Sequence, residues 1–157
     1  IPGIVLRTSI IVGFPGETEK DVEDLESFIL EGHFTNLGVF KYSPEPGTPA
    51  FELPNQIETK EKEARYKRLM LAQQKVNTDR LKSFVGDEFE VLIEGTHEDT
   101  DLLFTGRTRF QAPEIDGTVI INEFSDGVSN VVPGQFGKVK ITEVVGYDLL
   151  GTLINVE

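Results

Sequence analysis

The sequence of 157 residues contains no cysteine and no tryptophan, and it contains only two histidines. Without cysteine the chain forms no disulfide, and it supplies no thiolate to a zinc site or an iron–sulfur cluster. His33 and His97 stand apart from other ligand types, so we expect no metal site. No side chains follow a nucleophile–base–orienter pattern, and we therefore predict no catalytic residue in this chain.

Long hydrophobic runs are absent as well. No apolar run approaches the roughly 20 residues that span a bilayer. The strand-like first residues have no charged n-region of a signal peptide. We therefore expect a cytoplasmic protein with no membrane partner. The length of 157 residues suffices for one core of ordinary size or for two small units.

Basic residues are scarce in the second half of the chain. Residues 84–157 hold 4 Lys+Arg against 14 Asp+Glu, a net charge of −10, whereas residues 1–83 carry −2. A segment of such charge repels nucleic-acid phosphates, whose binding relies on Lys and Arg. Two interpretations stay open: an acidic, solvated surface, and a surface for cationic partners such as basic proteins.

The first half of the chain reads as strand, helix and strand. Residues 4–13 are rich in β-branched and apolar types, and a second strand is predicted over residues 37–43. Between them, Thr18 is a candidate N-cap with Asp21 as its capping-box partner, and Gly32 is a C-terminal stop. The pattern predicts a βαβ unit with parallel strands and a right-handed crossover.

A proline-rich loop and a long helix follow. The helix is predicted from about residue 59 to residue 84, with Gly86 closing it. Its apolar stripe consists of Ala64, Leu69, Ala72, Val76 and Leu81. Five short β-rich runs after Gly86 predict a small closed or nearly closed β-barrel. We place a domain boundary near residue 85, so that residues 1–85 are α/β and residues 86–157 are all-β.

The turn Gly-Phe-Pro-Gly-Glu-Thr ends the first strand at the edge where α/β folds bind ligands. It lacks the Lys-Ser/Thr of a P-loop, and Glu17 and Glu19 complement the helix dipole and would repel a phosphate. Two interpretations remain. The turn is either a tight strand-to-helix connection, or one whose residues Gly13 and Gly16 let a ligand lie across the strand end.

Period-two alternation divides the first strand into two faces. The more polar face, suited to binding, consists of Arg7, Ser9, Ile11 and Gly13. The opposite face, suited to packing under helices, consists of Thr8, Ile10 and Val12.

Three motifs occur in order along the chain: "IIVGFPGET" from Ile10, "FKYSPEPGTPAF" from Phe40 and "GRTRFQAPEIDG" from Gly106. With the β-rich tail, they resemble the C-terminal half of the radical-SAM methylthiotransferases, and the tail resembles a TRAM domain. The second and third motifs are more similar to the RimO type, which modifies a ribosomal protein, than to the tRNA-modifying MiaB type. The resemblance covers nearly the whole chain.

The resemblance implies a parent enzyme with two 4Fe-4S clusters that cleaves S-adenosylmethionine to a radical and inserts a methylthio group into a C–H bond. For the RimO type, the target is an aspartate β-carbon of small-subunit ribosomal protein twelve. The chain would supply two late strands of a (β/α) radical-SAM barrel, followed by a five-stranded OB-like TRAM barrel. Because the chain lacks the cluster cysteines and starts inside the barrel, we expect a fragment that is inactive alone.

The resemblance also implies site residues. Ile11 and Gly13 match the adenine-facing positions of the radical-SAM strand motif. Further candidates for the same S-adenosylmethionine pocket are Arg7, Ser9, Val39 and Tyr42.

The acidic tail favours a basic ribosomal protein over tRNA as the substrate. Arg107 and Arg109 are local exceptions that contact RNA or pair with Glu114 and Asp116, and these four are the substrate-binding candidates. Asp116 and Gly117 also fit a simple turn between two strands. Two alternatives stay open: a fragment of a tRNA methylthiotransferase, and a non-enzymatic binding module that uses only the barrel-like tail.

Overall fold

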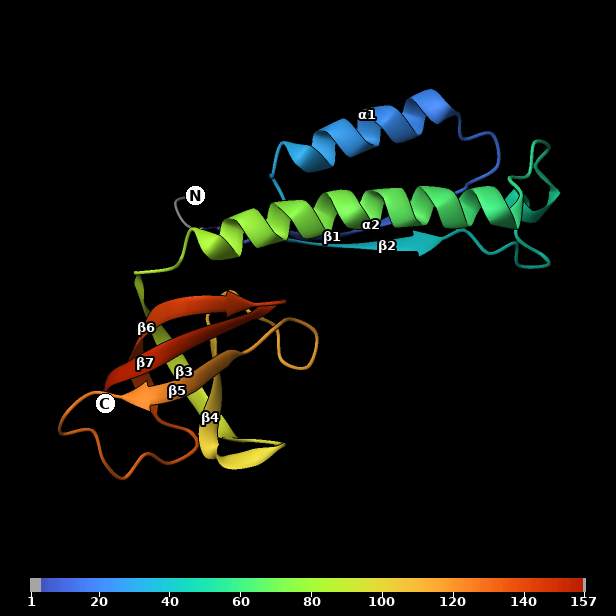
Figure 1. The fold of residues 1–157 in the computed structure, drawn as a ribbon. Coiled ribbons are helices and arrows are strands. Elements are labelled where there is room, and N and C mark those ends of the chain that lie inside the picture. Colours follow the sequence, from blue (N-terminus) through green and yellow to red (C-terminus); the bar gives the residue numbers. More distant parts are fainter. Residues whose placement is uncertain (1–3, 157) are drawn as a thin grey trace. The chain divides into compact units, whose positions relative to one another are not determined.

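The computed structural model describes residues 4–156 and divides the chain into two compact units, residues 1–77 and residues 78–157. Figure 1 traces their helices and strands along the chain. Each unit has a hydrophobic core of its own. Within residues 4–156, no helix has both the length and the apolar character needed to cross a membrane.

The first unit is built on the predicted βαβ motif. Strand β1 (Arg7–Val12) leads into helix α1 (Glu19–Leu30), which returns to strand β2 (Asn36–Lys41). The two strands pair in parallel, with Ile10 opposite Val39. The expected strand–helix–strand order and parallel pairing are confirmed, while β1 starts three residues later than predicted.

A short 3-10 helix (Pro49–Glu52) and the long helix α2 (Thr59–Lys82) complete the helical elements.

Helix α1 starts where its capping residues predict. The Thr18 side chain accepts a hydrogen bond from the Asp21 backbone N–H at 3.2 Å, and the Asp21 carboxylate accepts one from the Thr18 N–H at 2.8 Å. Two helix-end donors are thereby satisfied reciprocally. The helix ends before Gly32, whose φ of +76° is the left-handed conformation that glycine adopts most readily.

Both helices cover one face of the β1–β2 pair. The shared core consists of Val12, Val22, Ile29, Leu37, Val39, Leu69 and Ala72. The packing face predicted for β1 is confirmed, since Val12 is fully buried and Ile10 packs against this core. The predicted apolar stripe of α2 is wrong at its N-terminal end: Ala64 is exposed, and Lys62 and Arg65 are buried.

The second unit contains the predicted five-stranded barrel. Its strands are β3 (Glu88–His97), β4 (Thr100–Thr108), β5 (Val119–Phe124), β6 (Phe136–Val145) and β7 (Asp148–Val156). They close in the order β3-β4-β5-β7-β6, in which β5 and β7 run parallel and the other neighbours are antiparallel. The barrel interior is filled by fully buried aliphatic side chains, among them Val91, Ile93, Val119, Ile121, Val139, Ile141, Leu149 and Leu153.

Glycine allows close contact between strands inside this small barrel. A Cβ atom on Gly106 of β4 would lie 2.5 Å from the backbone oxygen of Leu92 and 2.6 Å from Val91 Cγ1 on β3. A Cβ atom on Gly95, also in β3, would meet no atom within 4 Å. The first glycine is therefore required by packing, and the second is not.

Candidate functional site

The chain turns sharply at the end of β1. Gly13 has a φ of +76° and Gly16 one of +86°, so the extended conformation stops after Val12. The Gly13 N–H donates to both carboxylate oxygens of Glu17, at 2.9 and 3.0 Å. The alternation predicted for β1 therefore does not continue to Gly13, which is buried, whereas Ile11 is 58% exposed.

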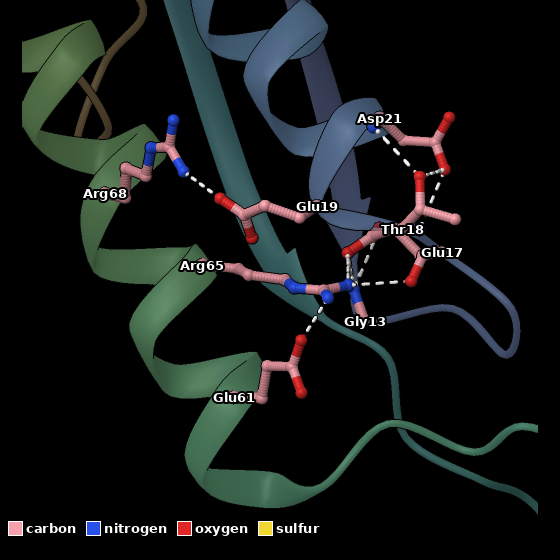
Figure 2. A network of polar contacts seen from close by, with 8 residues as sticks. All are labelled: Gly13, Glu17, Thr18, Glu19, Asp21, Glu61, Arg65 and Arg68. Carbon is pink, nitrogen blue, oxygen red and sulfur yellow. Dashed lines mark hydrogen bonds and ion pairs between the residues drawn. The ribbon is translucent and has the colours of Figure 1, made fainter.

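Arg65 of α2 holds the same carboxylate from the other side (Figure 2). Its guanidinium donates to Glu17 Oε1 at 2.6 Å and to the Glu17 backbone oxygen at 3.2 Å, and it also pairs with Glu61 one turn earlier. Burial disfavours the charged guanidinium, but the hydrogen bond from Arg65 to Glu17 and the charges of Glu61 and Glu17 outweigh it, so the Arg65 pKa lies above its ordinary value.

Glu17 therefore acts differently from the sequence-based expectation. It lies before the first residue of α1 and binds the turn itself, rather than only complementing the helix dipole. The Glu17 carboxylate already accepts the hydrogen bond from the Gly13 N–H that a bound phosphate would accept. The anion at this position is therefore part of the protein. No local sequence pattern indicates the partner of Glu17, because Arg65 is 48 residues away along the chain.

A buried lysine supports the neighbouring strand tip. The stem of Lys62 fills the space that a Cβ atom on Gly13 would occupy. Its ammonium donates to the Tyr42 backbone oxygen at 3.0 Å and lies 4.9 Å from the centre of the Tyr42 ring. The Phe14 ring meets Tyr42 edge-on at 5.2 Å. Among the described residues, the buried Tyr42 hydroxyl has no hydrogen-bond partner.

The other face of the β1–β2 pair is open. Ser9 pairs with Gly38 and Ile11 with Phe40, so these four residues share one face. Ile11 is 58% exposed and Phe40 57%. Together they form an apolar surface at the carboxyl ends of parallel strands, where α/β folds bind ligands.

Not all predicted pocket residues lie on this open face. Arg7, Ser9 and Ile11 lie on it, whereas Val39 is buried under the helices on the opposite face. Phe40 also lies on this face, as the period-two alternation of β2 predicts, although its sequence neighbourhood does not single it out.

The barrel of the second unit carries few cations. Its four Lys+Arg residues after Phe84 are Arg107, Arg109, Lys138 and Lys140. Leu92 of β3 pairs with Arg107 on one side and with Phe136 on the other, so the three share the outer barrel face. Lys138 and Lys140 follow on β6, opposite Glu90 and Glu88. The remaining surface of the barrel is therefore strongly acidic.

The predicted substrate-binding residues have separate structural settings. Arg107 forms an ion pair with Glu94 on β3, rather than with either acid of its own motif, while Arg109 is exposed. Glu114 has a φ of +61°, and Asp116 accepts a hydrogen bond from the Ala112 N–H at 2.7 Å. Asp116 thus contributes to the fold of the loop.

The loop between β4 and β5, residues 109–118, is held by its own side chains. Gln111 accepts hydrogen bonds from the Thr108 N–H and hydroxyl at 2.9 Å, and its amide donates to Gly117 O at 2.5 Å. The connection is longer than the two-residue turn that Asp116 and Gly117 suggest. Much of the "GRTRFQAPEIDG" motif is explained by this hydrogen bonding.

Within residues 4–156, no group of three or more potential metal ligands comes together. Each histidine lies beside a single carboxylate: His33 Nε2 is 2.7 Å from Glu31 Oε2, and His97 Nδ1 is 3.8 Å from Asp99 Oδ2.

The fold consists of a parallel βαβ unit with an exposed strand end, followed along the chain by a closed five-stranded barrel. The family model of the TRAM domain matches residues 85–154. The barrel is therefore a TRAM domain, as the family resemblance implied.

Over nearly its whole length, the chain is similar to enzymes named ribosomal protein uS12 methylthiotransferase RimO. It is 47% identical over 154 residues to that of Protochlamydia amoebophila (strain UWE25), which covers 98% of this chain and 32% of the relative. It is 47% identical to that of Koribacter versatilis (strain Ellin345), with 98% and 30% covered. It is 46% identical to that of Geobacter sulfurreducens, with 99% and 34% covered.

These relatives confirm the resemblance to the RimO-type methylthiotransferases. The chain spans about a third of the length of the curated relatives that it matches.

Proposed function

We propose that this chain is part of a cytoplasmic radical-SAM enzyme that methylthiolates an aspartate β-carbon of ribosomal protein uS12. The observation that carries the proposal is the 44–47% identity to RimO enzymes over 98–99% of the chain. In this proposal, residues 1–85 are the late strands of the radical-SAM barrel with a linking helix, and residues 86–157 are the TRAM domain.

The open strand end is the proposed wall of the S-adenosylmethionine pocket. The exposed side chains of Ile11 and Phe40 offer the apolar surface that an adenine ring needs. Two residues after Phe40, the buried Tyr42 hydroxyl has no hydrogen-bond partner among the described residues. The residues present therefore fit such a ligand. When bound and reduced by a cluster, S-adenosylmethionine supplies the radical chemistry.

The iron–sulfur clusters belong to the rest of the enzyme in this proposal. The 157 residues contain no cysteine, so both clusters require thiolates from elsewhere in the parent protein. The chain's own contribution is to bind and orient the nucleoside and to recognise the substrate. We expect the chain alone to be inactive.

The TRAM domain is the proposed site for uS12 recognition. A net charge of −10 over residues 84–157 attracts a basic protein and repels RNA phosphates. A local RNA contact is a second candidate, supported by Lys138 and Lys140 on the outer face of β6 and by the exposed Arg109 directly after β4. That contact would involve the β4–β3–β6 face only.

The test uses the full-length protein that contains this chain, with its clusters reconstituted without oxygen. It is incubated with S-adenosylmethionine, a reductant and either purified uS12 or tRNA, and the products are analysed by mass spectrometry. We expect a methylthio group on one aspartate of uS12 and no change in tRNA. Modified tRNA would support the MiaB-type alternative, and a protein without iron would support the non-enzymatic binding module.

A further inference from the structure

Two arginines of α2, one turn apart, reach toward the segment that contains the β1 turn and α1 (Figure 2). Arg68 is 35% exposed and pairs with Glu19 at 2.5 Å and with Glu26 at 2.6 Å. Arg65 is only 6% exposed, and its partner Glu17 is 13% exposed. The two arginines therefore provide a natural comparison between a surface ion pair and a buried one.

The buried pair is connected to the strand tip, and the surface pair is not. Glu17 binds Arg65 with one oxygen and shares both oxygens with the Gly13 N–H. Removing Arg65 would leave the Glu17 carboxylate buried without its cation, which is far more damaging than losing an exposed pair. The carboxylate would then move toward water, and the Gly13 N–H would lose its acceptor.

The conformation of Gly13 determines what β1 exposes. Its φ of +76° turns the chain away from the strand direction directly after Val12. The Lys62 stem packs against Gly13 and leaves no room for Gly13 to move toward α2. Ile11 is therefore left open beside Phe40. If Gly13 relaxed toward an extended conformation, the following residues would continue along the strand and cross the edge of this surface.

We propose that Glu17 and Arg65 are positioning residues for the nucleoside ligand. They touch no ligand themselves; they hold Gly13 in its left-handed conformation and so keep the Ile11–Phe40 surface accessible. The inference rests on the proposed S-adenosylmethionine pocket and assigns to the "GFPGET" glutamate a role that depends on a distant arginine.

The experiment measures binding without turnover. S-Adenosylhomocysteine, which carries the same nucleoside but does not react, is titrated calorimetrically into the full-length, cluster-loaded protein. The variants are Arg65→Lys, Arg65→Gln and Glu17→Gln, with Arg68→Gln as the matched control from the same helix face. Thermal unfolding of each protein is recorded in parallel.

We expect the three Arg65 and Glu17 variants to weaken binding by about 10- to 100-fold, as when only about 1–10% of the protein keeps the turn in its binding-competent conformation. Arg68→Gln should bind as the wild type does. The double variant Arg65→Gln/Glu17→Gln should be no weaker than the worse single variant, because both act through the same Gly13 hydrogen bond. In turnover assays, KM for S-adenosylmethionine should rise more than kcat falls.

Equal affinities of the Arg65→Lys, Glu17→Gln and Arg68→Gln proteins would overturn the positioning role. The role would also be overturned if the loss of affinity of each variant, Arg68→Gln included, were proportional to its fall in melting temperature. If Arg65→Gln fails to fold, the affinity of Arg65→Lys decides whether Arg65 is a positioning residue. Lysine keeps the positive charge but lacks the forked guanidinium that donates to Glu17. A wild-type protein that binds no S-adenosylhomocysteine would refute the proposed function itself.

Discussion

Gly106 provides a sharp test of how the barrel is packed. An alanine at this position would place its Cβ 2.5 Å from the Leu92 backbone oxygen, where ordinary contact requires at least 3.4 Å. Because the Leu92 oxygen is a backbone atom, it cannot move aside as a flexible side chain would. The strands β3 and β4 must therefore separate by about 1 Å, nearly the difference between these two distances. Overpacking of this kind costs about 1–3 kcal/mol, and weakening the adjacent ladder hydrogen bond adds about 1 kcal/mol.

We therefore expect Gly106→Ala to lower the free energy of unfolding of the barrel by about 2–4 kcal/mol. The matched control is Gly95→Ala on the neighbouring strand, where a Cβ meets nothing within 4 Å. That variant should be neutral or more stable by about 0.5 kcal/mol, because alanine suits a strand better than glycine.

The assay is a urea titration followed by NMR amide signals of Val119 and Ile121, which report on the barrel alone. If Gly106→Ala lost less than about 1 kcal/mol, or if Gly95→Ala lost as much, close strand contact would not be the reason for the glycine.

Further predictions concern the first unit and use urea denaturation followed by its own amide signals. Leu69 is fully buried, so Leu69→Ala should lower the unfolding free energy by about 2–5 kcal/mol. Leu71→Ala, at a position 65% exposed, should change it by less than about 0.5 kcal/mol, and equal effects would contradict the assigned face of α2. Thr18→Ala should reduce stability by about 1 kcal/mol through the lost N-cap, and no loss would argue against the capping box. Hydrogen bonds from the Thr18 backbone and hydroxyl lower the pKa of Asp21. Its stabilising contribution is complete above the unfolded pKa of about 4 and disappears as the pH falls through the lowered folded value. Asp21→Asn should therefore flatten the decline of stability in that acid range, and an unchanged profile would refute the assignment.

Local patterns predicted the elements well. Thr18 and Asp21 are close in sequence, and their capping box follows from short-range chemistry alone. The five barrel strands were likewise visible, because alternating side chains and turn residues mark each strand within its own sequence.

Long-range contacts account for what the sequence did not reveal. No pattern near Glu17 indicates Arg65, and burial of a cation within α2 contradicts the usual apolar stripe. Arg107 has two acids within its own motif, yet it pairs with Glu94 because the β3–β4 register brings that residue alongside. Gly13 left the predicted face because a positive φ ends the alternation.

The strand order of the barrel has a consequence for its biosynthesis. β7 lies between β5 and β6, although it follows both in the sequence. During translation, the two strands that flank this gap emerge before the strand that fills it. Until residue 156 has left the ribosome, β5 and β6 present unpaired edges that other chains can join. A transcript interrupted before Asp148 would therefore produce an open sheet that is prone to aggregate through its unpaired edges, instead of a smaller barrel.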